Sequence, residues 1–252
     1  QILEIYDQVE EKSEALLSVA NEIRAVRAFY FYIGLDLFRN IPIVERYDVP
    51  EEYLPEQDAA NQVFYFIETE LREGIPLLNN TISTETYGRM HRYAAYTLLA
   101  KLYLNSETFT GVPSWDRAID CCDSVINSQK FSLNEDYFDN FSVNNESSLE
   151  NIFVIPFDDL EAVDWGRVFN HHLWTLHFSS APTFDMSEGG WNGMCALPSF
   201  YRSYDPEDIR RDSWLTGVQK GLNGQVLFCT QEKICDTLNF TVDVSSLEAA
   251  FE

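Results

Sequence analysis

The spacing of apolar residues predicts a helical first half of the chain. Up to residue 128, segments rich in apolar residues and long enough for helices alternate with connectors that contain Pro or Gly. The pattern predicts helices over residues 10–38, 56–78, 88–107 and 115–128. Two antiparallel pairs are the simplest arrangement of these helices.

Local signals mark where two of these helices begin or end. In "RNIPIV", Asn40 suits a left-handed cap at the end of the first helix, and Pro42 blocks its continuation. In "GVPSWD", Ser114 is the expected N-cap of the last helix, and Asp116 lies in its positive first turn.

The stretch "RAFYFYIGLDLF" is apolar in almost every direction around the first helix. Such a helix is expected where neighbouring helices of a stacked array cover it on several sides. We therefore expect the aromatic residues 29–32 to pack in a core rather than to bind a ligand. Arg27 and Asp36 interrupt the stretch, and no segment has the ~20 uninterrupted apolar residues that a membrane span needs.

The second half reads as loops with a few short strands. "NEDYFDNFSVNNESSLEN" has the composition of a loop, and residues 158–216 show no regular pattern. "NIFVIPF" at 151–157, "GQVLFCTQ" and "TLNFTVDV" are each predicted to be a strand. The expected fold is mainly α, a helical scaffold over residues 1–130 followed by an irregular, loop-rich subdomain with short strands over residues 131–252. Long irregular loops usually carry function, so we expect the ligand site in the second part.

Charge narrows the classes of ligand. The chain has 17 basic and 41 acidic residues, a formal net charge of -24. Nucleic-acid binding depends on phosphate neutralisation by Lys and Arg, so no nucleic-acid partner is expected. An acidic surface accepts neutral ligands or cations, although solubility is the plainest reason for the charge.

No motif indicates a metal, a cofactor or catalysis. His171, His172 and His177 do not form the H-E-x-x-H pattern of a zinc protease. The five cysteines lack metal-ligand spacing, and adjacent Cys121 and Cys122 would point ~100° apart on a helix, which disfavours a disulfide between them. The sequence has no G-x-S-x-G and no phosphate-binding glycine loop. A structural calcium in the loop 134–145 is possible but unsupported, because the EF-hand pattern is missing.

The junction "YAAYTLLAKLYLNSETFTGVPSWDRAIDCCDSVI" looks like that of tetratricopeptide repeats. A helix rich in small residues is followed by a loop and then by Trp115 and Ala118, three positions apart. We expect Trp115 to lie in the core.

Four segments, in their order along the chain, resemble the SusD/RagB family of Bacteroidetes glycan-binding lipoproteins. They are "EIRAVRAFYFYIGLDLFRNIPIV", "GRMHRYAAYTLLAKLYLN" with "WDRAIDCCDSVI", "ENIFVIPF" and "GGWNGMCALPSFYRSYDPEDIRR". The resemblance covers most of residues 10–215, and because family members are typically longer, the chain looks like an internal portion of one.

The resemblance implies a tetratricopeptide-like scaffold overlaid by an irregular subdomain that holds the ligand. It also implies non-catalytic binding of an oligosaccharide or polysaccharide for delivery to a TonB-dependent, SusC-like transporter. The expected location is the cell surface at the outer membrane, with a lipid anchor on an N-terminal Cys that is not in this sequence.

The segment "DWGRVFNHHLWTLHFSSAPTFDMSEGGWNG" has the residue types that bind sugars. Aromatic rings stack on the C–H faces of sugars, and polar side chains bond to their hydroxyls. The glycan-binding candidates are Trp165, Asn170, His172, Trp174 and Trp191. The glycines of "EGGWNG" are expected to shape a tight turn that presents Trp191. The alternative is that these tryptophans pin loops onto the scaffold, since Trp is highly buried on average.

Two other functions stay open. A helical-repeat scaffold could bind a peptide or protein partner, which would require a contiguous exposed apolar patch. Less favoured is an acid-type glycoside hydrolase in which paired carboxylates such as Asp185 and Glu188 flank a sugar.

Overall fold

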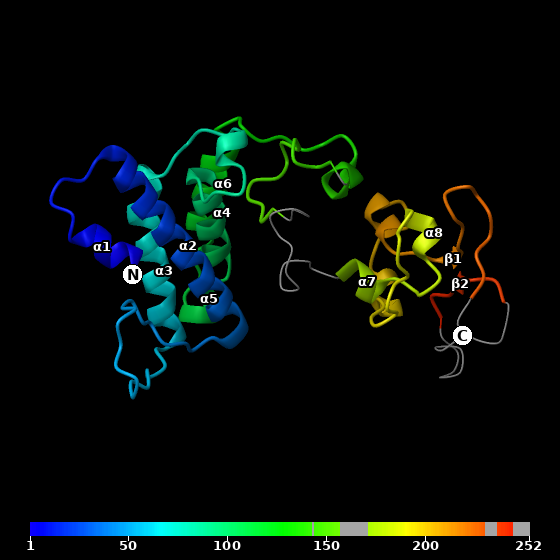
Figure 1. Ribbon diagram of the computed structural model, residues 1–252, viewed down its shortest axis with the longest axis horizontal. Helices are drawn as coiled ribbons and strands as arrows, with labels where there is room; N and C mark the ends of the chain where they lie inside the picture. Colours follow the sequence, from blue (N-terminus) through cyan, green and yellow to red (C-terminus); the bar gives the residue numbers. More distant parts are fainter. Residues whose placement is uncertain (143, 157–170, 230–235, 244–252) are drawn as a thin grey trace. The chain divides into compact units, whose positions relative to one another are not determined.

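The chain forms two compact units, residues 1–156 and 157–252 (Figure 1). The computed structural model describes residues 1–142, 144–156, 171–229 and 236–243. The first unit is built of helices, whereas the described residues of the second form short helices, turns and one pair of strands. The expected fold class, mainly α with a few short strands, is confirmed.

The helices of the first unit are α1 (Ile2–Asp7), α2 (Glu14–Phe38), α3 (Ala60–Gly74), η1 (Ile75–Leu77), η2 (Thr84–Thr86), α4 (Arg92–Leu104), α5 (Ser106–Thr110), α6 (Trp115–Ile126) and η3 (Tyr137–Phe141). The second unit contains α7 (His171–Thr175), α8 (Ala181–Phe184), α9 (Pro198–Tyr201), η4 (Ile209–Ser213), β1 (Gly217–Val218) and β2 (Asn239–Phe240).

The long helices pack in two pairs, α2 with α3 and α4 with α6, and α3 joins the pairs by contacting α4 (Figure 1). Fully buried Ala28 and Ala95 allow close approach of their helices, and Phe64, Ile67 and Leu71 of α3 fill the core between them. Burial of each such large side chain contributes about 1.5–3 kcal/mol. The core therefore holds both helix pairs together.

A buried carboxylate links α3 to both helices of the second pair. Glu68 is only 7% exposed and accepts a hydrogen bond from the Tyr103 hydroxyl of α4 at 2.8 Å. It also forms an ion pair with Arg117 of α6, whose guanidinium lies 4.2 Å from the centre of the Tyr103 ring. Burial raises the pKa of Tyr103, and the hydrogen bond and charge of Glu68 raise it further. The phenol therefore stays a donor at neutral pH.

A second buried carboxylate joins the first pair. Glu70 of α3 accepts hydrogen bonds from Nε and Nη2 of Arg27 on α2, at 2.9 and 2.5 Å. A buried charge is tolerated when it is paired and hydrogen-bonded. Burying Glu68 and Glu70 would be costly without partners. Their hydrogen bonds and ion pairs offset that cost and connect α3 to the neighbouring helices.

The first long helix begins later than predicted. Residues 10–13 lie outside α2, which starts at Glu14 because the Ser13 hydroxyl caps it by accepting a hydrogen bond from the amide of Leu16 at 3.2 Å. The end at Phe38 is confirmed, but the residue with positive φ is Arg39, at 64°, and not Asn40.

Asn40 has a different role, at the start of the next helix. Its side-chain oxygen accepts a hydrogen bond from the amide of Ala60 at 3.0 Å, and Gln62 accepts one from Ala59 at 2.9 Å. These bonds satisfy amides that a helix start leaves without partners, so α3 begins at Ala60 rather than at residue 56.

The other two predicted helices are partly confirmed. The segment 88–107 holds α4 and the start of α5, with a break at Asn105. The last helix begins at Trp115 as predicted and has Asp116 in its first turn, but Ser114 makes no capping side-chain hydrogen bond.

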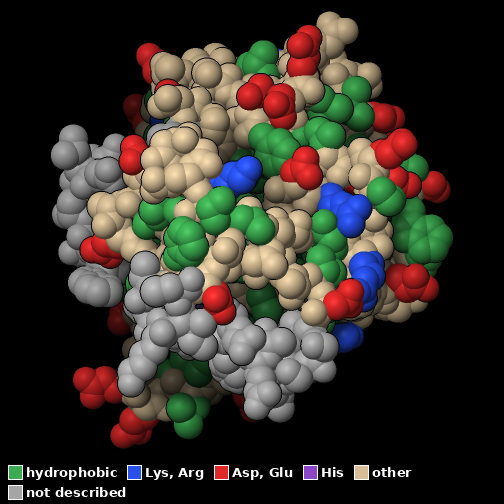
Figure 2. All heavy atoms as spheres, turned by 90° about the vertical axis from the view of Figure 1, so that its right-hand side faces the viewer, with side chains coloured by type: hydrophobic (Ala, Val, Ile, Leu, Met, Phe, Trp, Pro, Cys, Tyr) green, Lys and Arg blue, Asp and Glu red, His purple; other side chains and the backbone are tan. Residues whose placement is uncertain are grey.

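The prediction that Trp115 lies in the core is wrong, because its side chain is 55% exposed. Ala118 is buried, whereas Trp115, Ile119 and Ile126 share the outward face of α6. The expectation for residues 29–32 holds only in part, since Tyr32 is buried but Tyr30 is 68% exposed. Figure 2, a view from the right-hand side of Figure 1, shows further hydrophobic side chains at the surface among charged and polar ones.

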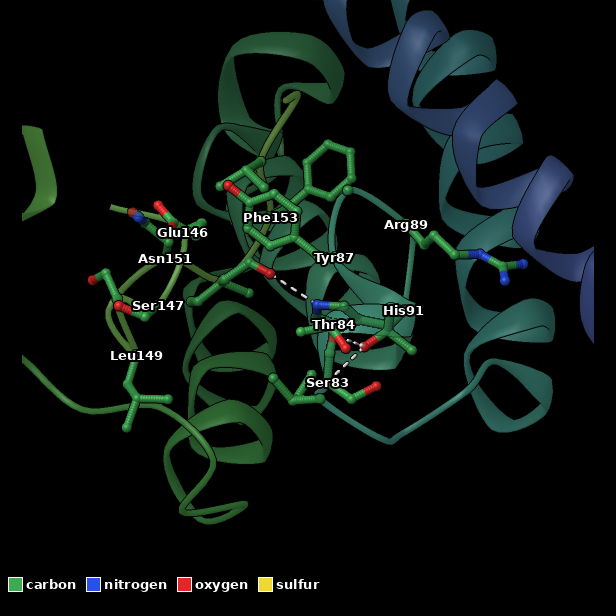
Figure 3. Close-up of a pocket in the computed structure, with 16 residues that line it drawn as sticks. Ser83, Thr84, Tyr87, Arg89, His91, Glu146, Ser147, Leu149, Asn151 and Phe153 are labelled. Atoms are coloured by element: carbon green, nitrogen blue, oxygen red, sulfur yellow. Dashed lines mark hydrogen bonds between the residues drawn. The ribbon is translucent and has the colours of Figure 1, made fainter. Parts of the chain in front are cut away.

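Residues 131–156 belong by their contacts to the helical unit, although the predicted boundary lay at residue 130. Phe153 packs edge-on against Phe29 of α2, with ring centres 5.7 Å apart. The Nε2 atom of His91 lies 2.8 Å from the carbonyl oxygen of Ile152 (Figure 3). Over the described residues 151–156 the predicted strand is absent, because this segment packs on helices and not beside another strand.

The polar loop after α6 is closed by its own side chains. Asn134 donates from its backbone amide to Glu150 at 3.0 Å and from its side chain to Asn140 at 2.9 Å. The hydrogen bond from the Asn134 amide lowers the pKa of Glu150. Ser148 also donates to Asn140, at 2.6 Å. Calcium in this loop stays an untested prediction.

The strands of the second unit form one short antiparallel ribbon. Gly217 of β1 pairs with Phe240 of β2, so the predicted strand "TLNFTVDV" is confirmed in part. Over its described residues 224–229, the segment "GQVLFCTQ" contributes isolated bridges, Lys220 with Val226 and Phe228 with Thr237, and no regular strand. Among the described residues, no helix is long and apolar enough to cross a membrane.

Replacing Glu68 by Ala should destabilise the helical unit by about 1.5–3 kcal/mol, since it leaves Tyr103 and Arg117 without their shared acceptor. Urea unfolding followed by far-UV circular dichroism measures this. Arg72→Ala is the matched control, because Arg72 is 62% exposed and only approaches Glu68 to 3.9 Å. Its cost should stay within about 0.5 kcal/mol. An equal loss of unfolding free energy in the two variants would contradict the assigned role of Glu68 in connecting the helices.

The stability that His91 contributes should fall as the pH is lowered. Burial lowers the pKa of His91, so the folded protein resists the proton that the unfolded chain takes up below about pH 6.5. The stabilisation is complete above that pH and is lost as the pH falls towards the lowered pKa of the folded state. The difference in unfolding free energy between the wild type and His91→Gln should therefore narrow from about pH 7.5 to about pH 5.

The control for this experiment is His172→Gln, which replaces an exposed histidine. Comparing each variant with the wild type at every pH removes the contribution of the many carboxylates, which all three proteins share. A constant difference for His91→Gln across the range would contradict the assignment of a neutral, buried imidazole.

Candidate functional site

Two of the predicted glycan-binding tryptophans lie next to each other at the surface. Trp174 belongs to α7, and Trp191 lies in the loop between α8 and α9. Their ring centres are 6.4 Å apart and their planes are inclined by 41°. Each residue is 43% exposed. We call them the tryptophan pair, and they offer two neighbouring aromatic surfaces to a ligand.

Backbone hydrogen bonds hold the loop of Trp191 against the end of α7. The amide of Trp191 donates to the carbonyl of Leu173 at 2.6 Å, and the amides of Gly193 and Met194 donate to that of Trp174 at 2.8 and 2.9 Å. The carbonyls of a last helical turn have no partner within the helix. The loop supplies those partners and so fixes the position of both rings.

Glycines are required where this loop meets the chain that follows α7. A Cβ on Gly190 would lie 2.0 Å from the carbonyl oxygen of Leu176, and one on Gly189 would lie 2.2 Å from that of Phe178. Real Cβ atoms do not approach backbone oxygens so closely, so only glycine fits at either position. Within this loop Asn192 has a φ of 49°, a value that Asn tolerates better than most residues, and the predicted tight turn is absent. The "EGGWNG" cluster does therefore present Trp191, by close contact rather than by positive φ at its glycines.

The other predicted site residues are distributed differently. His172 is exposed on α7, the same short helix as Trp174. Trp165 and Asn170 lie outside the described residues. His177 has a local structural role, since its Nδ1 accepts a hydrogen bond from the amide of Ser179 at 3.0 Å. The assignment of Trp165, Asn170, His172, Trp174 and Trp191 as a binding set stays a prediction.

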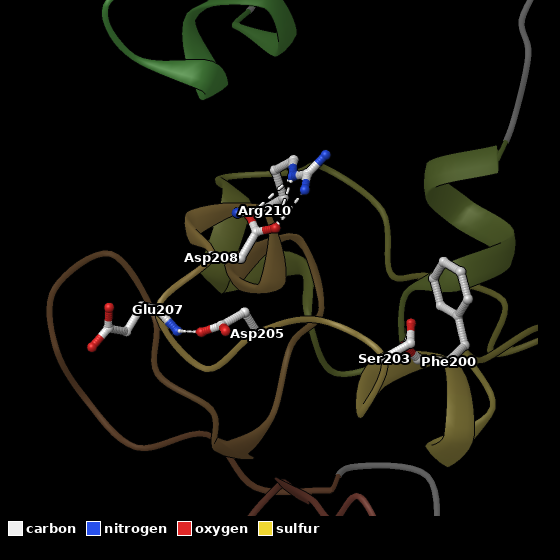
Figure 4. A network of polar contacts seen from close by, with 6 residues as sticks. All are labelled: Phe200, Ser203, Asp205, Glu207, Asp208 and Arg210. Atoms are coloured by element: carbon white, nitrogen blue, oxygen red, sulfur yellow. Dashed lines mark hydrogen bonds and ion pairs between the residues drawn. The ribbon is translucent and has the colours of Figure 1, made fainter.

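The carboxylates of "YDPEDIRR" serve the local fold (Figure 4). Asp205 accepts a hydrogen bond from the amide of Glu207 at 2.9 Å, and Asp208 accepts one from the amide of Arg210 at 3.0 Å. The side-chain hydrogen bond from the Arg210 guanidinium lowers the pKa of Asp208, and the amide bond lowers it further. The 3-10 turn η4 starts after Asp208, which is its N-cap.

Groups that could hold a metal or carry catalysis are sparse in the part of the chain that the structure describes. There, no three His, Cys, Asp or Glu residues cluster as metal ligands would. Cys121 and Cys122 are both free thiols, which confirms that they do not pair with each other. Of the two carboxylates considered for hydrolysis, Asp185 ends α8 with a φ of 54°, and Glu188 is exposed.

Replacing Gly190 by Ala should displace the Trp191 loop, because the new methyl group would overlap the carbonyl of Leu176. The expected results are a weaker near-UV circular dichroism signal from the tryptophan pair and faster hydrogen exchange at the amides of Trp191 and Gly193. Gly193→Ala is the matched control, since its Cβ would lie 3.5 Å from the nearest atom, an ordinary contact. Identical spectra for the two variants would contradict the assigned role of Gly190.

Sequence comparison finds similarity to a starch-binding protein. No family model matches the chain. The starch-binding protein SusD of Bacteroides thetaiotaomicron is 29% identical over 143 residues, which cover 56% of this chain and 25% of that protein.

Solved structures give the same result for the fold. Surface glycan-binding protein A from Bacteroides thetaiotaomicron, solved in complex with laminarihexaose, is 25% identical with a TM-score of 0.69, over 83% of this chain and 44% of that one. A laminarin-binding SusD-like protein is 23% identical with a TM-score of 0.67, over 79% of this chain and 46% of that one. The chain thus spans less than half the length of these relatives. In sequence the chain is similar to SusD, and in fold it is similar to SusD-like glycan-binding proteins.

Proposed function

We propose that the chain binds oligosaccharide or polysaccharide at the tryptophan pair and does not cleave it. The observation that carries the proposal is the pair itself, two half-exposed rings with centres 6.4 Å apart in a loop-rich unit. Similarity to a starch-binding protein and to a protein solved with laminarihexaose supports it and points to glucans.

The inclination of the two rings bears on the shape of the ligand. Rings inclined by 41° cannot both stack on one flat, straight ribbon of sugars. A glucan that turns from one unit to the next presents successive faces at an angle and can contact both. Each stacked ring contributes about 1 kcal/mol beyond burial of area, so affinity for a short fragment is modest. It rises when several units of a polysaccharide engage.

Charge favours a neutral glycan. The formal net charge of -24 disfavours uronic acid and sulfated polymers, whereas a neutral glucan meets no such barrier.

The proposal extends to the setting that the family resemblance implies. There the chain is part of a lipid-anchored protein at the outer-membrane surface that passes glycan to a SusC-like, TonB-dependent transporter. Capture without cleavage suits this role, because the transporter would take up what the binding protein releases.

One observation favours the alternative of a scaffold that binds a protein. The outward face of α6 carries Trp115, Ile119 and Ile126, a row of exposed apolar side chains at helical spacing. Such a row suits a helix or strand of a partner. This row lies in the helical unit and the tryptophan pair lies in the other unit. Substitutions on α6 therefore test protein binding without altering the tryptophan pair.

Isothermal titration calorimetry with laminarihexaose and maltoheptaose tests the proposal. Trp174→Ala and Trp191→Ala should each weaken binding at least about five-fold, since each removes one stacking surface. Trp115→Ala is the matched control, because it removes an exposed tryptophan from the other unit, and it should leave affinity unchanged.

A reducing-end assay on the same mixtures tests the absence of cleavage. New reducing ends that disappear in Asp185→Asn or Glu188→Gln would replace the proposal with a hydrolase. Binding that is lost only in Trp115→Ala would point to the face of α6 instead.

A further inference from the structure

The helical unit has a pocket of its own, between residues 82–91 and residues 146–154 (Figure 3). Its volume is about 330 Å³. Sites for small molecules in proteins typically span about 300–1,000 Å³, so this pocket has room for a single small ligand.

The walls of the pocket are fixed by hydrogen bonds. His91 connects them, through the 2.8 Å contact between its Nε2 and the carbonyl oxygen of Ile152. Within the first wall, Thr86 Oγ1 accepts a hydrogen bond from the amide of Ser83 at 2.9 Å. Gly88 has a φ of 71°, and a Cβ added there would lie 3.0 Å from the ring of Pro156, so the two walls approach closely at this glycine. The pocket is therefore formed before any ligand binds.

The positive groups at the pocket are already engaged. Both bonds of Arg89 go to the carboxylate of Glu22 on α2, at 3.1 and 2.5 Å, and in Figure 3 its side chain extends away from Glu146. Burial lowers the pKa of His91, and its Nδ1 accepts a hydrogen bond from the amide of Ala94 at 3.2 Å. The described lining residues thus leave no cation for a phosphate, sulfate or carboxylate ligand.

The groups that remain suit a neutral ligand with many hydroxyls. Glu146, Ser147 and Asn151 lie together on one side of the pocket (Figure 3). A carboxylate accepts hydrogen bonds, an amide both accepts and donates, and a hydroxyl does either. Tyr87 and Phe153 add aromatic surface to the lining. Acceptors and donors beside aromatic carbon match the hydroxyls and the C–H face of one sugar ring.

We propose that this pocket is a second glycan subsite that takes a single neutral sugar unit. The inference rests on the proposed function and deepens it, since it adds a site in the helical unit to the tryptophan pair of the other unit. Two weak sites on one chain raise the apparent affinity for a long polysaccharide above that for a short fragment. The two segments that line the pocket are more than fifty residues apart in the sequence, so a search for local sequence motifs does not find the pocket.

Nuclear magnetic resonance titration of the 252-residue chain with glucose and laminarihexaose tests the inference. The informative background is the double variant Trp174→Ala, Trp191→Ala. There, laminarihexaose should still bind weakly and shift the amide signals of Ser147 and Asn151. Adding Glu146→Gln should weaken this residual binding about five-fold or more, because a charged acceptor of sugar hydroxyls is lost.

Glu85→Gln is the matched control. It removes the same charge from an exposed position beside one wall, outside the pocket lining, and should leave residual binding unchanged.

Three results would overturn the inference. If the double variant binds no glycan while the wild type does, the tryptophan pair is the whole site and the proposed function stands alone. If tetramethylammonium shifts the pocket signals and glucose does not, the pocket binds a cation through Glu146. If the wild type responds to neither glucose nor laminarihexaose at either site, the proposed function fails and this inference fails with it.

Discussion

The hydrogen-bonded ion pair of Glu68 is the contact on which the helical unit depends. One buried carboxylate binds Tyr103 of α4 and Arg117 of α6, so within the shared apolar core it adds a directional contact between α3 and the second helix pair. The cost of burying that charge is offset only while both partners are in place. The start of α4 then positions His91, and His91 holds Ile152. The pocket wall is thus connected, contact by contact, to a residue in the core.

The second unit is organised differently. Its described elements are short, and its surface aromatics are placed by main-chain bonds rather than by a large core. At the tryptophan pair, the last carbonyls of α7 bind the loop that carries Trp191, and Gly189 and Gly190 allow the contact. A rigid helical part and a loop-built part suit a protein whose scaffold stays constant while its ligand site varies.

Periodicity in the sequence predicted the helices but not which of their faces are covered. Apolar spacing located the helical segments, and "EGGWNG" does carry Trp191 at the surface, although as a loop bonded to the end of α7 and not as the predicted tight turn. Trp115 and Tyr30 were expected in a core because the pattern records hydrophobicity, whereas burial depends on which helix packs alongside. The strand over 151–157 failed for the same reason, since Phe153 packs on Phe29. The helix starts at Glu14 and Ala60 depend on capping bonds from Ser13 and Gln62 that hydrophobic spacing does not encode.

The way the Trp191 loop is anchored has a consequence for how such sites diversify. Its anchors are amides, carbonyls and two glycines, none of which depends on the identity of residues 174 and 191. Tyrosine, phenylalanine or a smaller residue at either position would therefore keep the same path of the main chain. The aromatic surface at these two positions can change without a change in the geometry of the loop. The main-chain anchor and the exposed rings are therefore separable features of this loop, and the rings can change while the anchor stays the same.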